Sequence, residues 1–226
     1  MIRGVILDGD GTILDSMGIW KNFARDCLKE LKIEDPDFPQ EQIEDASLKE
    51  AAQIFIDHYR LDQSVEEMLE FFQERLRWIY AHSVELLPGA AKYLAELEER
   101  KIPCMIATAG DEVCVRSVLR RYGLEPTCDG VFDCTSVRIG KTDPAIYDLA
   151  RRNMHLTKEE VMVFEDALYA LQCASENGYP CIAICSEYDP EYEEKSACAL
   201  WTMPDYKDMD RFWKLCEEPE EDRSTR

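Results

Sequence analysis

The hydrophobic positions of this chain follow two different periods, and the change of period separates two kinds of predicted structure. Residues 2–7 form a short run of aliphatic and β-branched side chains, which is the composition of a strand buried on both faces. Between residue 16 and about residue 83 we find no strand pattern, because apolar residues recur there at the spacing of amphipathic helices. The pattern therefore predicts one strand followed by a helical segment of about seventy residues.

From residue 88 onward the predicted elements alternate between helix and strand. The helices are expected at residues 89–99, 112–122, 143–154 and 167–177, and the strands at residues 103–107, 131–135, 161–164 and 181–185. Such βα alternation is typical of a parallel, doubly wound sheet with right-handed crossovers. The acidic residues 187–195 and 217–226 are expected to be solvated, and the second segment to be a disordered tail.

The fold class that follows is α/β, a doubly wound parallel sheet with an inserted all-helical part. We expect residues 1–15 and 85–226 to form the sheet domain. Residues 16–84 would form the helical domain, inserted directly after the first strand.

The charge and cysteine content restrict the partners of this protein. The 226 residues carry a formal net charge of −21, which disfavours binding to nucleic acid or to an anionic membrane surface. There is no apolar span long enough for a membrane helix and no signal-peptide pattern, and the ten cysteines contain no Cys-x-x-Cys pair. We therefore expect a cytoplasmic protein with reduced cysteines, and the choice between monomer and dimer stays open.

Two aspartates follow the first predicted strand at once, in the order Asp8-Gly9-Asp10. Open α/β sheets hold their ligands at the carboxyl ends of the strands, so both acids are expected at a ligand site. Two such carboxylates repel each other unless a cation or a shared proton relieves them. A calcium loop does not fit, because Ile13 and Ile19 would occupy the positions of its glycine and its closing glutamate. The turn indicates either a divalent metal site or an acid–base pair.

Three other predicted strand or helix ends carry residues suited to phosphoryl transfer. Thr108 and the amide of Ala109 could hold phosphoryl oxygens, although a lone threonine at a strand end is also a common cap. Lys141 could neutralise a phosphate as a compact charge, although most lysines are solvated surface residues. Glu165 and Asp166 directly follow an apolar strand, where two acids suit a hard cation.

Taken together, these segments resemble the signatures of the haloacid dehalogenase (HAD) superfamily, which consists mostly of Mg²⁺-dependent phosphatases. The resemblance lies in Asp8-Gly9-Asp10-Gly11-Thr12, in Gly140-Lys141-Thr142-Asp143-Pro144-Ala145-Ile146-Tyr147, which is similar to G-K-P-x-P-x-I-[YF], and in Phe164-Glu165-Asp166-Ala167. The chain departs from the family pattern at Gly9, Thr142, Ala167 and Ala170. The helical residues 16–84 would correspond to the cap that this family inserts after its first motif.

The resemblance implies a role for each of the matching residues. Asp8 would be the nucleophile that becomes an aspartyl-phosphate, and Asp10 the general acid and base, which places the chain with phosphatases rather than with dehalogenases. Thr108, the amide of Ala109 and Lys141 would bind the phosphoryl group.

The same resemblance implies Mg²⁺ as the cofactor. Its ligands would be the Asp8 carboxylate, the Asp10 main-chain carbonyl and Asp166, with Glu165 next to these ligands or linked to the metal through water. The implied function is Mg²⁺-dependent hydrolysis of a small phosphorylated metabolite. Two alternatives stay open: a phosphomutase similar to β-phosphoglucomutase, and a receiver-like or inactive protein that only binds Mg²⁺ or phosphate.

Overall fold

The structure is a computed structural model, and it describes residues 1–35, 43 and 46–217. By its internal contacts the chain divides into two compact units, Met1–Asp15 with Glu85–Arg226, and Ser16–Val84. The predicted disordered tail lies outside the described residues, apart from Glu217.

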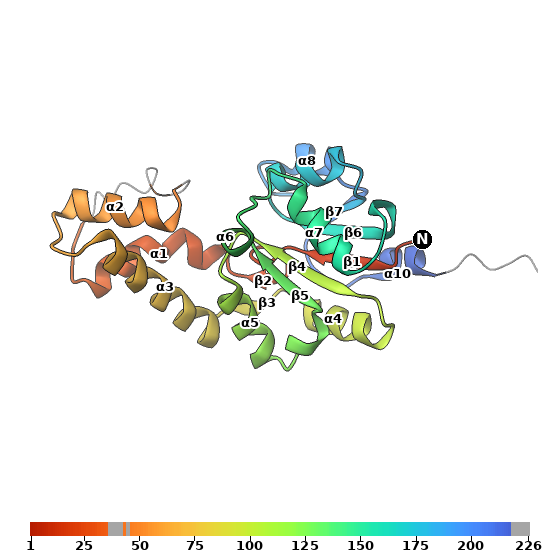
Figure 1. The fold of residues 1–226 in the computed structure, drawn as a ribbon, viewed down its shortest axis with the longest axis horizontal. Coiled ribbons are helices and arrows are strands. Elements are labelled where there is room, and N and C mark those ends of the chain that lie inside the picture. The colour runs from red at the N-terminus through yellow and green to blue at the C-terminus, as the bar shows by residue number, and fades with distance from the viewer. Residues whose placement is uncertain (36–42, 44–45, 218–226) are drawn as a thin grey trace, which may run out of the picture. The chain divides into compact units, whose positions relative to one another are not determined.

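The larger unit is built on a six-stranded parallel sheet (Figure 1). Its strand order is β5-β4-β1-β6-β7-β8, with bounds β1 (Gly4–Leu7), β4 (Cys104–Thr108), β5 (Gly130–Asp133), β6 (Val161–Glu165), β7 (Cys181–Ile184) and β8 (Trp201–Met203). β1 pairs with β4 on one side and with β6 on the other, and all four of its residues are buried. The first strand of the chain is therefore central in the sheet, and the prediction of a parallel α/β fold is confirmed.

Helices cover both faces of this sheet. α4 (Ala90–Glu99) and α5 (Glu112–Arg121) lie on one side of it, and α7 (Ala145–Asn153) and α8 (Leu168–Glu176) lie on the other (Figure 1). The shorter elements are the helices α6 (Cys134–Val137), α9 (Tyr192–Cys198) and α10 (Asp210–Cys216), and the 3₁₀ turns η2 (Glu125–Thr127) and η3 (Lys158–Glu160). This covering on both faces explains why the strands read as continuous apolar runs.

The two faces of the sheet have different cores. On one face Ile6 and Val163 pack with Tyr147 of α7 and Leu171 of α8. The other face carries a group of stacked and edge-to-face aromatic rings, made of Tyr93, Phe164, Tyr206, Phe212 and Trp213. Val163 and Phe164 point to opposite faces because side chains alternate along a strand.

The smaller unit is helical, as its periodicity predicts. It contains α1 (Met17–Glu30), α2 (Leu48–Tyr59) and α3 (Val65–His82). α2 and α3 each begin with a capping box, in which Ser47 pairs with Glu50 and Ser64 with Glu67. Edge-to-face contacts of Phe72 with Phe23 and Phe55 join the three helices.

A short antiparallel pair of strands belongs to the larger unit. β2 (Leu14–Asp15) pairs with β3 (Glu85–Leu86), with Asp15 opposite Glu85. The chain therefore leaves the sheet unit and returns to it along neighbouring strands.

Two details of the predicted sheet are wrong. β5 ends at Asp133 rather than at residue 135, because Asp133 Oδ1 accepts a hydrogen bond from Ser136 N at 2.8 Å and caps α6. Residues 181–185 were expected to form the last strand, but β8 follows them at the sheet edge. Trp201 and Thr202 of β8 are only half-buried, so this strand has no continuous aliphatic run.

Most of the segment 187–195 is exposed, as predicted, and Lys195 is the exception. Its last residues form the first turn of α9, and Lys195 is buried. The Lys195 ammonium lies 2.8 Å from Asp189 Oδ2 and 3.5 Å from Glu191 Oε2. These ion pairs compensate the cost of burying the charge.

The backbone at Gly89 generates a stability prediction. Gly89 has φ +85°, and a Cβ added there would lie 2.5 Å from the carbonyl carbon of Tyr206. Gly123 has φ +71°, but no described atom lies within 4 Å of the corresponding Cβ.

Gly123→Ala should lower the free energy of unfolding by about 1–2 kcal/mol, the cost of the left-handed conformation. Gly89→Ala should cost a further ~1–3 kcal/mol because of the backbone overlap. Urea unfolding of both variants measures the difference, and equal losses would contradict the close approach.

Candidate active site

The turn after β1 places Asp8 at the carboxyl end of the central strand. Asp8 N donates a hydrogen bond to Phe164 O of β6 at 3.0 Å, which fixes the start of the turn to the neighbouring strand. The chain then reverses through Gly11, whose φ is +75° and whose amide donates to Leu14 O at 2.9 Å. The Asp8 side chain is buried, so its charge needs partners within the protein.

Lys141 supplies the first of these partners. Its ammonium group is buried and forms ion pairs with Asp8 Oδ1 and with Glu165 Oε1, the latter at 2.8 Å. Lys141 lies just before α7, where Asp143 Oδ1 accepts a hydrogen bond from Ala145 N at 2.9 Å. The turn that starts α7 therefore places the Lys141 ammonium group at the carboxyl end of β1.

Three carboxylates converge around this lysine. Asp8, Glu165 and Asp166 each offer one oxygen, and these oxygens lie within 4.8 Å of one another. Three formal negative charges therefore face the single positive charge of Lys141, an excess of two. Glu165 Oε2 is buried and has no hydrogen-bond partner among the described residues. A hard divalent cation fits this all-oxygen set, because it would offset the charge and use the unpaired oxygen.

The pKa shifts of the clustered acids also favour a bound cation. Burial raises the pKa of Glu165 to about 8; Lys141 opposes this shift, and Asp8 and Asp166 reinforce it. Burial and the charge of Asp8 raise the pKa of Asp166 to about 7. Burial alone would lower the pKa of Lys141, but Asp8 and Glu165 outweigh it and raise that pKa above its ordinary value. Lys141 therefore stays charged, and the acids need a further cation to ionise fully.

The end of β4 lies close to the same turn. Thr108 is buried, and its Oγ1 accepts a hydrogen bond from Gly110 N at 3.0 Å. A Cβ on Gly9 would lie 3.1 Å from Thr108 Oγ1. The absence of a side chain at Gly9 therefore lets the turn after β1 lie close to the end of β4.

Asp10 lies on the side of β4 rather than within the acid cluster. A Cβ on Gly110 would lie 2.7 Å from Asp10 Oδ2, which places this carboxylate against the loop that follows Thr108. Ala109, in the same loop, is exposed. The Asp10 carboxylate thus lies by the loop after β4, whereas the Asp8 carboxylate pairs with Lys141.

All seven residues selected from the sequence therefore lie at or beside the carboxyl ends of β1, β4 and β6. The structure brings Asp8, Lys141, Glu165 and Asp166 into one cluster. It places Thr108 at the end of β4, and Ala109 and the Asp10 carboxylate at the loop that follows. Their chemical roles stay predictions.

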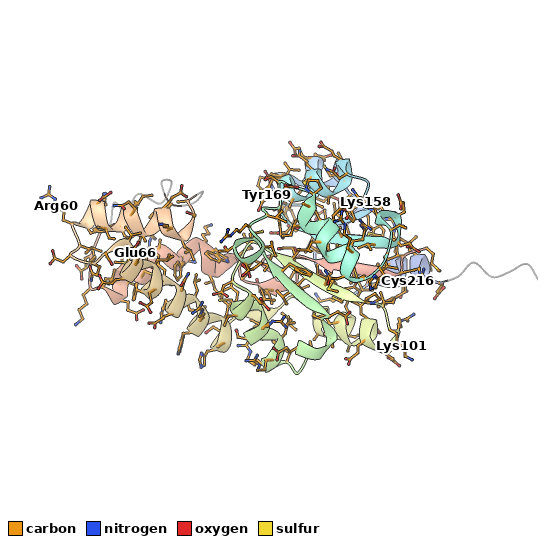
Figure 2. The ribbon with its side chains drawn as sticks, in the orientation of Figure 1. Arg60, Glu66, Lys101, Lys158, Tyr169 and Cys216 are labelled. Atoms are coloured by element: carbon orange, nitrogen blue, oxygen red, sulfur yellow. The ribbon has the colours of Figure 1, made fainter. Side chains whose placement is uncertain are left out.

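Two tyrosines near this cluster were missed by sequence reasoning. The Tyr147 hydroxyl donates a hydrogen bond to Glu165 Oε1 at 3.0 Å. Tyr169, labelled in Figure 2, lies in the first turn of α8, and its side chain is partly exposed. Partial burial of its hydroxyl group raises the pKa of Tyr169; Lys141 opposes this shift, and Glu165 and Asp8 reinforce it. The only signal for Tyr147 was its place at the end of the lysine motif, and Tyr169 had none.

Comparison with known proteins gives consistent matches over most of the chain. Phosphorylated carbohydrates phosphatase from Thermotoga maritima is 23% identical over 177 residues, which cover 78% of this chain and 82% of that protein. Hexitol phosphatase A from Escherichia coli is 29% identical over 172 residues, which cover 73% of this chain and 74% of that protein.

Among solved structures, a candidate β-phosphoglucomutase from Thermotoga maritima matches with a TM-score of 0.80 at 20% identity. The match covers 96% of this chain and 100% of that chain, and at this identity it establishes the fold alone. In the part of the chain that the structure describes, no helix has the length and apolar character needed to span a membrane.

A match to a protein family covers most of the chain. Residues 5–184, which include every residue of the cluster, fit the family described as haloacid dehalogenase-like hydrolase. The chain belongs to the haloacid dehalogenase-like hydrolases.

Proposed function

We propose that this protein is a Mg²⁺-dependent phosphatase that hydrolyses a small phosphorylated sugar or sugar alcohol through an aspartyl-phosphate on Asp8. The observation that carries the proposal is the buried ion pair between Lys141 and Asp8 inside a cluster of three carboxylates. The names of two relatives, a phosphorylated carbohydrates phosphatase and a hexitol phosphatase, support the substrate class.

Asp8 is the nucleophile in this proposal. Lys141 holds one of its oxygens, Oδ1, in an ion pair, so Oδ2 is available to attack phosphorus in line with the leaving oxygen. The Asp8–phosphorus bond forms as the bond to the leaving oxygen breaks. Water then attacks the same phosphorus, which releases inorganic phosphate and regenerates Asp8.

Asp10 carries the proton in both steps. It donates a proton to the leaving oxygen as the ester bond breaks, and it removes a proton from the attacking water. The position of its carboxylate beside Gly110, outside the acid cluster, supports this assignment. An acid that shared the cluster's cation would be a poor proton donor.

The remaining residues hold the anionic substrate. The overall charge of −21 repels a phosphate ester, so the site needs its own positive charge. Lys141, the Thr108 hydroxyl and the Ala109 amide would bind the phosphoryl oxygens.

The cation site would be formed by the Asp8 carboxylate, the Asp10 main-chain carbonyl and Asp166, with Glu165 close by. Bound Mg²⁺ would reduce the repulsion between the anionic nucleophile and the anionic substrate.

A phosphomutase is the second candidate, because the same cluster could return the phosphoryl group to a sugar. Incubation with β-glucose 1-phosphate and catalytic glucose 1,6-bisphosphate separates the two. Release of inorganic phosphate in excess of glucose 6-phosphate is expected. Conversion to glucose 6-phosphate without phosphate release would instead identify a mutase.

Replacing the nucleophile gives a direct test of the proposed mechanism. Asp8→Asn should lower Mg²⁺-dependent hydrolysis of p-nitrophenyl phosphate and of sugar phosphates by more than about 10³-fold, because the amide is not a nucleophile. Asp129→Asn is a matched control, since Asp129 bonds Cys104 N at the opposite end of β4. It should retain activity within about twofold. Wild-type turnover by the Asp8 variant would refute the mechanism.

The pH dependence of stability provides an independent prediction. Glu165 and Asp166 have higher pKa values in the folded than in the unfolded state, so the folded protein keeps protons that the unfolded chain releases. In EDTA their contribution to stability should therefore fall between about pH 4 and about pH 8, by up to ~1.4 kcal/mol per pH unit for each proton.

Mg²⁺ binds the ionised acids, so the increase in melting temperature on adding MgCl₂ should grow from pH 5 to pH 8. The double variant Glu165→Gln/Asp166→Asn should show neither effect. An equal Mg²⁺ response at both pH values in the wild type would contradict the assignment of these acids.

A further inference from the structure

We infer that Tyr147 is a positioning residue for the cation site, in which its hydroxyl group and Lys141 hold Glu165 Oε1 and thereby present Glu165 Oε2 to Mg²⁺. The inference rests on the proposed function, because it needs the cation to bind at the cluster of Asp8, Glu165 and Asp166. It assigns a task to a residue that neither touches the substrate nor binds the metal.

The first argument is the unequal bonding of the two Glu165 oxygens. Oε1 receives a hydrogen bond from the Tyr147 hydroxyl at 3.0 Å and an ion pair from Lys141 Nζ at 2.8 Å. Oε2 is buried and has no hydrogen-bond partner among the described residues. An ionised carboxylate accepts about four hydrogen bonds, so burying one oxygen without a partner is costly. A cation or its bound water would remove that cost.

The second argument is the rigidity of the tyrosine. Tyr147 has no exposed surface and packs against the sheet with Ile6 and Val163. Its ring also lies against Tyr179, with 5.9 Å between the ring centroids. A side chain enclosed in this way has few alternative positions, so its hydroxyl group is a fixed reference for the carboxylate.

The third argument is that Lys141 alone cannot fix Glu165. Its ammonium group also pairs with Asp8, so any shift of Asp8 during the reaction would move the lysine and the glutamate with it. Tyr147 joins Glu165 to α7 independently of Asp8. The other acceptor near the hydroxyl, Ala170 O, is farther away at 3.4 Å and is uncharged, so Glu165 is the preferred partner.

The variant Tyr147→Phe isolates the hydroxyl group, because the ring and its packing are kept. Mg²⁺ binding to the metal-free protein is measured by calorimetry, without substrate. Removing an outer hydrogen bond to a metal ligand weakens metal affinity by about 10–100-fold, so the dissociation constant should rise at least about tenfold. A change of less than twofold would overturn the inference.

Tyr93→Phe is the matched control. Tyr93 is also fully buried, but its hydroxyl group has no hydrogen-bond partner among the described residues, and it lies in the aromatic group on the other face of the sheet. Its Mg²⁺ dissociation constant should stay within about twofold of the wild type. An equal loss of affinity in both variants would mean a general packing effect and would overturn the inference.

A double-mutant cycle with Glu165→Ala tests whether Tyr147 acts through the glutamate. In the Glu165→Ala background, Tyr147→Phe should cause no further loss of Mg²⁺ affinity, because the group it positions is absent. An additive loss would overturn the inference while leaving the cation site intact. If the wild-type protein itself binds no Mg²⁺, the proposed Mg²⁺-dependent function fails instead.

Discussion

The interaction on which the site depends is the burial of one ammonium group between two carboxylates. Lys141 lies between Asp8 and Glu165 with almost no exposed surface, and the two carboxylates compensate the cost of burying its charge. The lysine is introduced just before α7, the aspartate follows β1, and the glutamate ends β6. Correct formation of the ion pair therefore requires the order of the strands and the start of the helix together.

The sheet makes this convergence possible through its strand order. β1 lies between β4 and β6, so the two strands whose ends carry Thr108 and Glu165 are the direct neighbours of the one that precedes Asp8. Parallel strands bring their carboxyl ends to one edge. Groups that are far apart in the sequence thus meet without any long loop, and the backbone that carries them is hydrogen-bonded on both sides.

Much of this could be predicted from the sequence, for identifiable reasons. Strands buried on both faces appear as continuous apolar runs, so β1, β4, β6 and β7 could be predicted. The acids and the threonine at the ends of β1, β4 and β6 were selected because ligands bind at the carboxyl ends of parallel strands. β8 was missed because it is short and only half-buried. The bond between Tyr147 and Glu165 joins residues 18 positions apart through the packing of α7 on the sheet, which no local pattern encodes. The burial of Lys195 likewise depends on Asp189, a partner supplied by the fold.

The pairing of β2 with β3 has a consequence for the history of the protein. Because Asp15 and Glu85 face each other, the chain leaves the sheet unit and returns to it at two adjacent points. The free-energy cost of closing the chain between these two points grows only slowly with the length of the insertion. Such an attachment allows one inserted segment to be exchanged for another during evolution while the chemistry at the sheet edge is inherited unchanged.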